Sequence, residues 1–277
     1  MGEQTTYISK RKLNKDKEEL FYFEKSEFNK IIKKKINWLS KKKALSNMLR
    51  LNILYMIQNA GSGHIGTSFS SIDLVNYIYF DFLNKEDIYF SSKGHDVPAL
   101  YSVLMVKNIL PFSNIHKFRK IKGLPGHPDI KTKGIHANTG SLGMGISKAK
   151  GFLLADNSKK KNRRVIVLTG DGELQEGQFW ESLINIPKII SKNLTIIIDN
   201  NKYQSDLSIE DTSSLGNLKN KLESFNIKTF TCDGNNFDDI KKIFNKIKNI
   251  NATKAIIANT IKGKGVSFIE GKPSIKN

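Results

Sequence analysis

Apolar and polar residues follow one another along this chain in a pattern that predicts alternating strands and helices. Short, largely apolar runs predict strands that are covered on both faces, at 88–91, 164–169, 194–198, 227–232 and 254–260. Apolar residues at helical spacing predict helices over 44–59, 97–107, 145–155, 178–190 and 237–250, and one from Ser70 or Ser71 to about 83. This alternation predicts an α/β fold, a doubly wound parallel sheet with helices on both faces.

The first 42 residues differ from the rest of the chain. Their apolar positions are irregularly spaced, which predicts a basic, polar and partly helical N-terminal extension (1–42) ahead of a single domain (43–277). Residues 1–50 carry 14 Lys and Arg against 6 Asp and Glu, within a net charge of +19 for the whole chain. Such a stretch can contact nucleic acid. Because no RNA-binding motif or zinc-finger spacing accompanies the charge, we expect solvated lysines and no nucleic-acid partner.

The cysteine count and the lengths of the apolar runs limit the possible cellular locations and the possible classes of protein. Cys232 is the only cysteine, which excludes a disulfide framework and a cysteine-based zinc site. No apolar run approaches the roughly 20 residues that a membrane-spanning helix needs. The lysine-rich beginning of the chain has no apolar signal core. We therefore expect a cytoplasmic protein with no membrane partner.

Two polar motifs follow two successive predicted strands. Gly170-Asp171-Gly172 directly follows one of them, and Asn201 follows the next one along the chain. In a parallel sheet the carboxyl ends of the strands lie at one edge, where ligands bind. Glycines let backbone N–H groups approach an anion, while the Asp171 carboxylate, the Asn201 amide oxygen and a carbonyl such as that of Tyr203 are oxygen ligands that suit Mg²⁺. The two motifs therefore predict a site for Mg²⁺ and phosphate.

The run GDGELQEGQFWES followed by IIIDNNKYQ resembles the thiamine-diphosphate-binding domain of transketolases. Further blocks agree in the same order: SGHIGTSFSSIDL, SSKGHDVPALYSVL, GLPGHPD and NTGSLGMGIS. The ELQEG segment after GDG is similar to transketolases rather than to pyruvate dehydrogenases or deoxyxylulose-phosphate synthases. The resemblance covers residues 43–270. It implies a thiamine-diphosphate-binding fold that holds this cofactor through Mg²⁺, for which Ca²⁺ or Mn²⁺ can substitute.

The resemblance also implies roles for the motif residues. Asp171, Asn201 and the carbonyl of Tyr203 match the family's metal ligands. The residues that match cofactor contacts are Gly140, Ser141, Leu142, Gly170, Gly172 and Glu176, the last of them at a subunit interface.

Three histidines, His64, His95 and His127, match those that surround the reacting end of the cofactor and the donor sugar in the family. Each directly follows a glycine in a predicted loop. Ketol transfer needs proton movements at sugar hydroxyls, and imidazole both gives and takes protons near neutral pH. We therefore expect these histidines to be catalytic.

Two departures from the family pattern bear on function. A full transketolase continues into a pyrimidine-binding domain, whose glutamate activates the cofactor, and no segment here resembles that domain. We therefore expect a pyrimidine-domain partner subunit, in a symmetric heterotetramer. After Glu270 the sequence reads GKPSIKN, without the histidine that family members usually carry there.

The function expected from the resemblance is transfer of a two-carbon ketol unit from a ketose donor to an aldehyde acceptor. Two alternatives stay open from the sequence. One is another thiamine-diphosphate C–C ligase, which transfers an acyl unit from a 2-oxo acid. The other is a non-catalytic regulatory relative.

Overall fold

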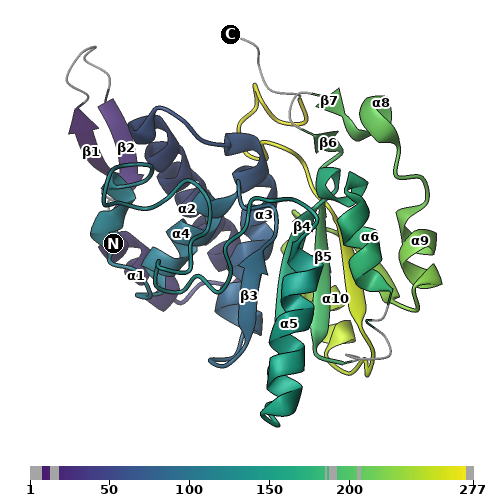
Figure 1. Cartoon of the computed structure of the whole chain (residues 1–277). Helices are drawn as coiled ribbons and strands as arrows, with labels where there is room; N and C mark the ends of the chain where they lie inside the picture. The colour runs from purple at the N-terminus through teal and green to yellow at the C-terminus, as the bar shows by residue number, and fades with distance from the viewer. Residues whose placement is uncertain (1–7, 13–18, 185, 187–191, 205–206, 273–277) are drawn as a thin grey trace.

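Five parallel strands form the central sheet of the computed structural model, which describes residues 8–12, 19–184, 186, 192–204 and 207–272. Their order across the sheet is β3 (Ile88–Ser91), β4 (Val165–Gly170), β5 (Leu194–Asn200), β9 (Lys254–Asn259) and β8 (Lys228–Asp233). Gly170 pairs with Asp199, so β4 and β5 end together at one edge of the sheet (Figure 1).

Helices cover both faces of this sheet. One face carries α2 (Trp38–Ala60), α3 (Ile65–Tyr77), α4 (Val97–Val106) and α10 (Phe237–Ile247). The other carries α5 (Gly145–Ser158), α6 (Gly177–Leu183) and α9 (Leu218–Ser224). Successive residues of β4 point to opposite faces, so Ile166 and Leu168 belong to the first core, and Val165 and Val167 to the second. The predicted α/β fold with helices on both faces is confirmed.

The predicted strands agree with the structure to within two residues at each end, whereas two predicted helix starts are wrong. The helix predicted over 44–59 begins six residues earlier, at Trp38, because the side chain of Asn37 caps it by accepting from the Ser40 backbone N–H. The helix expected to begin at Ser70 or Ser71 begins at Ile65, and a π-helical turn (Ile78–Phe82) follows it. Both serines are buried inside α3, and their hydroxyls donate to the carbonyl of Thr67. A serine inside a helix can bond to a backbone carbonyl one turn earlier, so these serines need not mark the start of the helix. Of the helix predicted over 178–190, the later part lies largely outside the described residues.

The N-terminal region contains two strands that the sequence pattern did not predict. β1 (Ile8–Lys12) and β2 (Glu19–Phe23) form an antiparallel hairpin, followed by α1 (Lys25–Lys33). The side chain of Asn52 on α2 accepts a bond from the Phe23 backbone N–H at 2.8 Å and donates to its carbonyl at 3.0 Å, and Phe28 of α1 is fully buried. β2 and α1 therefore pack on α2. The domain division at residue 42 stays a prediction.

Short elements fill several of the connections between the longer helices and strands. These are the 3₁₀ turns Phe112–His116 and Gly172–Gln175, the small hairpin of β6 (Tyr203–Gln204) and β7 (Leu207–Ser208), and α8 (Ile209–Ser213). No helix within the described ranges is long and apolar enough to cross a bilayer.

Candidate functional site

The turn after β4 carries Asp171, whose carboxylate is held by two backbone N–H groups. Asp171 is 1% exposed; its Oδ1 accepts from Gly172 N at 2.9 Å, and its Oδ2 accepts from Lys202 N at 2.6 Å. Lys202 lies in the turn after β5, so the second bond joins the two strand ends. The structure thus brings together the two motifs that were expected to meet at this edge (Figure 1).

Asn201 and Tyr203 form the turn after β5. Asn201 is 7% exposed, and its Oδ1 accepts from Tyr203 N at 3.0 Å. The Tyr203 hydroxyl donates to the carbonyl of Gly271 at 2.6 Å, which anchors this turn to the last described part of the chain. The turn therefore adds neutral oxygen atoms beside the carboxyl group of Asp171.

A buried ion pair lies beneath these two turns. The Lys93 ammonium lies 2.5 Å from Asp199 Oδ2 and 3.4 Å from Asp96 Oδ2, and it donates to Thr67 Oγ1 at 2.9 Å. Burial by itself lowers the pKa of Lys93, but the Asp199 and Asp96 carboxylates outweigh it and hold this pKa above its usual value. A Cβ built on Gly170 would lie 2.9 Å from Lys93 Cδ, so the lysine stem packs directly under the turn.

Glu173 ties three separate loops together at this edge. Its Oε1 accepts from Gly143 N at 2.9 Å and from the Ser92 hydroxyl, and its Oε2 accepts from Gly170 N at 3.3 Å. Glu173 is buried, which raises the pKa of its carboxyl group. The segments after β3, after β4 and before α5 therefore share one carboxylate as their anchor.

The loop that contains Gly140, Ser141 and Leu142 approaches the histidine loops closely. Gly140 has φ 123°, and a Cβ there would lie 2.7 Å from the His127 ring. Gly94 has φ 73°, and a Cβ there would lie 2.7 Å from Gly140 N. A side chain at either glycine would push these loops apart, so both positions require glycine.

The three predicted histidines lie together at this edge. The rings of His64 and His95 have centroids 5.2 Å apart. His127 contacts Gly140, which in turn contacts Gly94, the neighbour of His95 in sequence. Burial first, and then the positive charge of Arg119, lower the pKa of both His64 and His127.

The tautomer of His95 follows from its one backbone contact. His95 Nδ1 lies 2.9 Å from the carbonyl oxygen of Lys93. A carbonyl only accepts, so Nδ1–H donates and Nε2 keeps a free lone pair. Burial, with the nearby Lys93 charge, lowers the pKa of His95 to about 4. His95 is therefore neutral at physiological pH, with a nitrogen that can accept a proton.

We expect the His95 imidazole to remain neutral from pH 8 down to about pH 5. Its folded-state pKa lies below the ordinary 6.5, so the unfolded chain binds this proton more readily. The stability contributed is present above pH 6.5 and is lost as the pH falls through about 4. NMR of histidine-labelled full chain, with His95→Gln for assignment, measures this; a His95 midpoint near 6.5 would contradict it.

The oxygen atoms at the two turns fit a divalent metal bound to a diphosphate. In the described part of the chain, no cluster of three or more His, Cys, Asp or Glu side chains can hold a metal, so an ion here relies on one carboxylate and neutral oxygens. Mg²⁺ accepts such a site, because it shares its shell with phosphates and water. Burial and the Asp199 carboxylate raise the pKa of Asp171 to about 7, despite the two N–H donors. A bound cation would offset both effects.

Two further predicted cofactor residues lie at the same edge. Gly172 packs closely against Gln204: a Cβ built on Gly172 would lie 3.2 Å from the Gln204 side chain. Glu176 precedes α6 and is exposed, and a Cβ on Gly143 would lie 2.8 Å from its own Cβ. Glu176 therefore borders the loop ahead of α5 and faces solvent.

Sequence reasoning missed the buried charges that support the site: Lys93, Asp199 and Glu173. Each follows or ends a fully buried strand, and a charged residue at such a position is the signal that could have found it. Charges are rarely buried without partners, so these three had to bond one another or the adjoining loops.

Comparison with known proteins identifies the fold and the family. A family model described as "Transketolase, thiamine diphosphate binding domain" matches residues 41–275. The chain is 35% identical, over 243 residues, to one subunit of the apulose-4-phosphate transketolase of Actinobacillus succinogenes, covering 84% of this chain and 88% of that protein. It is 34% identical to the 6-deoxy-6-sulfo-D-fructose transketolase subunit SqwG of a Clostridium species. That alignment covers 84% of this chain and 89% of the relative.

The same likeness extends to full-length enzymes, of which this chain spans a part. The crystal structure of a transketolase from Campylobacter jejuni superposes with a TM-score of 0.75 at 27% identity, over 82% of this chain and 38% of that one. Human transketolase is 30% identical over 39% of its own length. This chain is a member of the transketolase family and represents its thiamine-diphosphate-binding domain.

Proposed function

We propose that this chain is the diphosphate- and Mg²⁺-binding subunit of a two-component transketolase, which transfers a two-carbon ketol unit from a ketose to an aldehyde. The bond from Lys202 N to the Asp171 carboxylate carries the proposal, because it joins the two strand-end motifs whose oxygen atoms would hold the metal. The relatives named as transketolase subunits support the division into two chains, since this chain covers 88% and 89% of two of them. Those relatives are named for different sugars, so the proposal extends to ketoses as a class.

The residues of this chain would bind and orient the cofactor. Asp171, Asn201 and the carbonyl of Tyr203 would hold Mg²⁺. Backbone N–H groups near Gly170 and Gly172 would meet the diphosphate, as glycine turns at strand ends do. When bound, thiamine diphosphate supplies the carbon nucleophile that ketol transfer requires. The loop of Gly140, Ser141 and Leu142, which has no bulky group at Gly140, would lie against it.

The three histidines would manage protons at the substrate hydroxyls. Neutral His95 can accept a proton at Nε2, because its Nδ1–H is committed to the Lys93 carbonyl. His64 and His127 lie close enough to share this role, and the lowered pKa of each keeps it largely neutral near pH 7.

A partner subunit would supply the pyrimidine-binding domain. Glu176 is exposed at the carboxyl edge of the sheet and is available for a contact with that partner. We propose a heterotetramer of two chains of each kind, by analogy with the symmetric assemblies common among homologous enzymes. The cytoplasmic location stays a prediction.

Reconstitution tests the proposed function. We expect the full chain mixed with its pyrimidine-domain partner to consume hydroxypyruvate in the presence of thiamine diphosphate, Mg²⁺ and an aldehyde, and to form the extended ketose. Either chain alone should be slower by at least about a hundredfold, because each lacks catalytic groups that act as a unit. Turnover by this chain alone would overturn the division of labour. Consumption of pyruvate instead of hydroxypyruvate would favour acyl transfer.

A further inference from the structure

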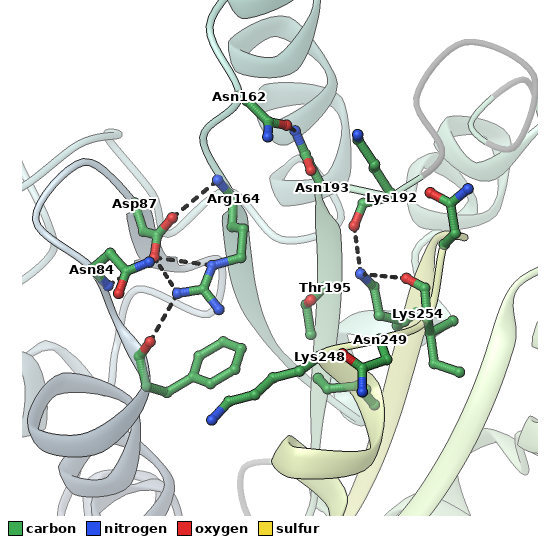
Figure 2. Close-up of a pocket in the computed structure, with 14 residues that line it drawn as sticks. Asn84, Asp87, Asn162, Arg164, Lys192, Asn193, Thr195, Lys248, Asn249 and Lys254 are labelled. Carbon is green, nitrogen blue, oxygen red and sulfur yellow. Dashed lines mark hydrogen bonds and ion pairs between the residues drawn. The ribbon is translucent and has the colours of Figure 1, made fainter.

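A polar cavity lies at the opposite end of the sheet from the candidate site. It has a volume of about 440 Å³ and is lined by residues at the amino ends of the strands, among them Arg164 before β4, Thr195 in β5 and Lys254 at the start of β9 (Figure 2). Strands of six or seven residues separate it from Asp171, a distance of about 20 Å at 3.3 Å per residue. The cavity is therefore separate from the proposed cofactor site.

The charges around this cavity are mostly positive. Four cationic side chains line it, from Arg164, Lys192, Lys248 and Lys254, against one carboxylate, Asp87. That carboxylate is already committed: Arg164 Nε donates to it at 3.0 Å, Arg164 Nη2 pairs with it, and the Asn84 backbone N–H donates to it at 2.8 Å. The three lysines therefore leave the cavity with an excess of positive charge.

Arg164 is held in one orientation at the cavity wall. Besides its bonds to Asp87, its Nη2 donates to the Phe82 carbonyl at 2.8 Å, and the guanidinium lies 4.3 Å from the centroid of the Phe82 ring. Arg164 therefore forms a fixed part of the cavity wall, and its charge is paired with Asp87.

Lys254 is the buried cation of the cavity. It is 6% exposed, and its ammonium donates to the carbonyl of Lys192 and, at 3.4 Å, to that of Ile250 (Figure 2). An ammonium has three donors, so one remains. Within the described residues no carboxylate pairs with it, and burial together with the Arg164 charge lowers its pKa to about 8. A bound anion would stabilise the charged form of this buried ammonium.

The rest of the lining determines what kind of anion fits. Asparagine amides, which both donate and accept, surround the cations: Asn84, Asn162, Asn193, Asn249 and Asn251. Phe82, Ile247 and Ile250 supply apolar surface. A volume of about 440 Å³ is in the range of small-metabolite sites, and a lone phosphate ion would leave most of it empty.

We propose that this cavity binds a small phosphorylated metabolite, with its phosphate at the remaining donor of Lys254, the exposed Lys192 and Lys248 side chains turned toward it, and its polar remainder against the asparagine amides. Lys192 and Lys248 are exposed and make no ion pair with other described residues, so both are available to a ligand. They lie in the segment before β5 and directly after α10, and Figure 2 shows both side chains extending away from the Lys254 ammonium, so each would turn toward a bound phosphate.

Calorimetry on the full chain tests the proposal with D-sorbitol 6-phosphate as the probe. This probe has no carbonyl group and is neither a ketol donor nor an acceptor, and saturating thiamine diphosphate and Mg²⁺ keep the cofactor site filled. We expect saturable binding at one site per chain, none for D-sorbitol, and weaker binding for inorganic phosphate. AMP in place of the polyol phosphate distinguishes a nucleotide from a sugar-derived ligand, and both are small phosphorylated metabolites.

A pair of matched double variants locates the binding. Lys192→Ala with Lys248→Ala is expected to weaken it at least about tenfold, since two charge-assisted contacts are lost. Lys34→Ala with Lys35→Ala removes the same charge from exposed positions at the end of α1 and should leave the affinity unchanged. The proposal is overturned by no saturable binding, by equal losses in the two variants, or by binding of a short RNA but of neither phosphorylated probe.

Discussion

Replacement of Asp171 by asparagine is expected to weaken Mg²⁺-dependent binding of thiamine diphosphate at least about a hundredfold, because the ion loses the one charged side chain of its proposed ligand set, worth several kcal/mol. The substitution keeps the size of the side chain. An amide NH₂ cannot accept the bond from Lys202 N, so the contact between the two strand ends is also weakened. The ketol-transfer activity of the reconstituted pair should fall in parallel.

Titration calorimetry with and without Mg²⁺, on the pair of chains, measures this loss. Asp233→Asn is the matched control, since Asp233 ends β8 at the same edge of the sheet but is exposed and lies outside the proposed ligand set. Circular dichroism should show both variants folded. If Asp171→Asn bound the cofactor as tightly as the unmodified chain, the metal would have to lie elsewhere, and the proposed site would be wrong.

Replacement of Lys93 by methionine is expected to lower the free energy of unfolding by about 3–5 kcal/mol, the usual cost of removing one partner of a buried ion pair. Among the described residues, fully buried Asp199 would keep the hydroxyls of Ser70 and Thr260 as the side-chain partners of its charge. Methionine preserves most of the packing of the lysine stem under Gly170. The loss is therefore electrostatic rather than steric.

Urea denaturation of the full chain measures the effect. Lys34→Met, an exposed lysine at the end of α1, should change the free energy of unfolding by less than about 0.5 kcal/mol. Combining Lys93→Met with Asp199→Asn should recover part of the loss, because the uncompensated charge is then removed. A loss below about 1 kcal/mol for Lys93→Met alone would show that this ion pair does not stabilise the fold.

Most of the sheet could be predicted from residue pattern because its strands are covered on both faces. A strand such as β4, with every residue buried, must be apolar along its whole length, and this shows in a single sequence. The N-terminal hairpin had no such signal. β2 mixes buried, half-buried and exposed positions, and its place depends on bonds to Asn52, which lies 29 residues further along the chain.

The candidate site divides in a similar way. Asp171 and Asn201 could be predicted to meet, since parallel strands end at one edge and each residue follows a strand. The sequence did not show that Lys202 N makes the contact, or that the Lys93 backbone sets the tautomer of His95. These depend on the distance between loops, which is decided by how the helices pack.

The amino-acid sequence by itself determined the α/β architecture, the edge of the sheet where ligands bind and the residue types available there. These features depend on local periodicity and on the order of strands and loops, and both can be read along one chain. Only the tertiary structure decided which charges are buried together, how Glu173 joins three loops, and that lysines from three separate segments surround one cavity at the far end of the sheet. Burial and charge pairing depend on contacts between segments that are far apart in the sequence. The local pattern of residues therefore cannot show them.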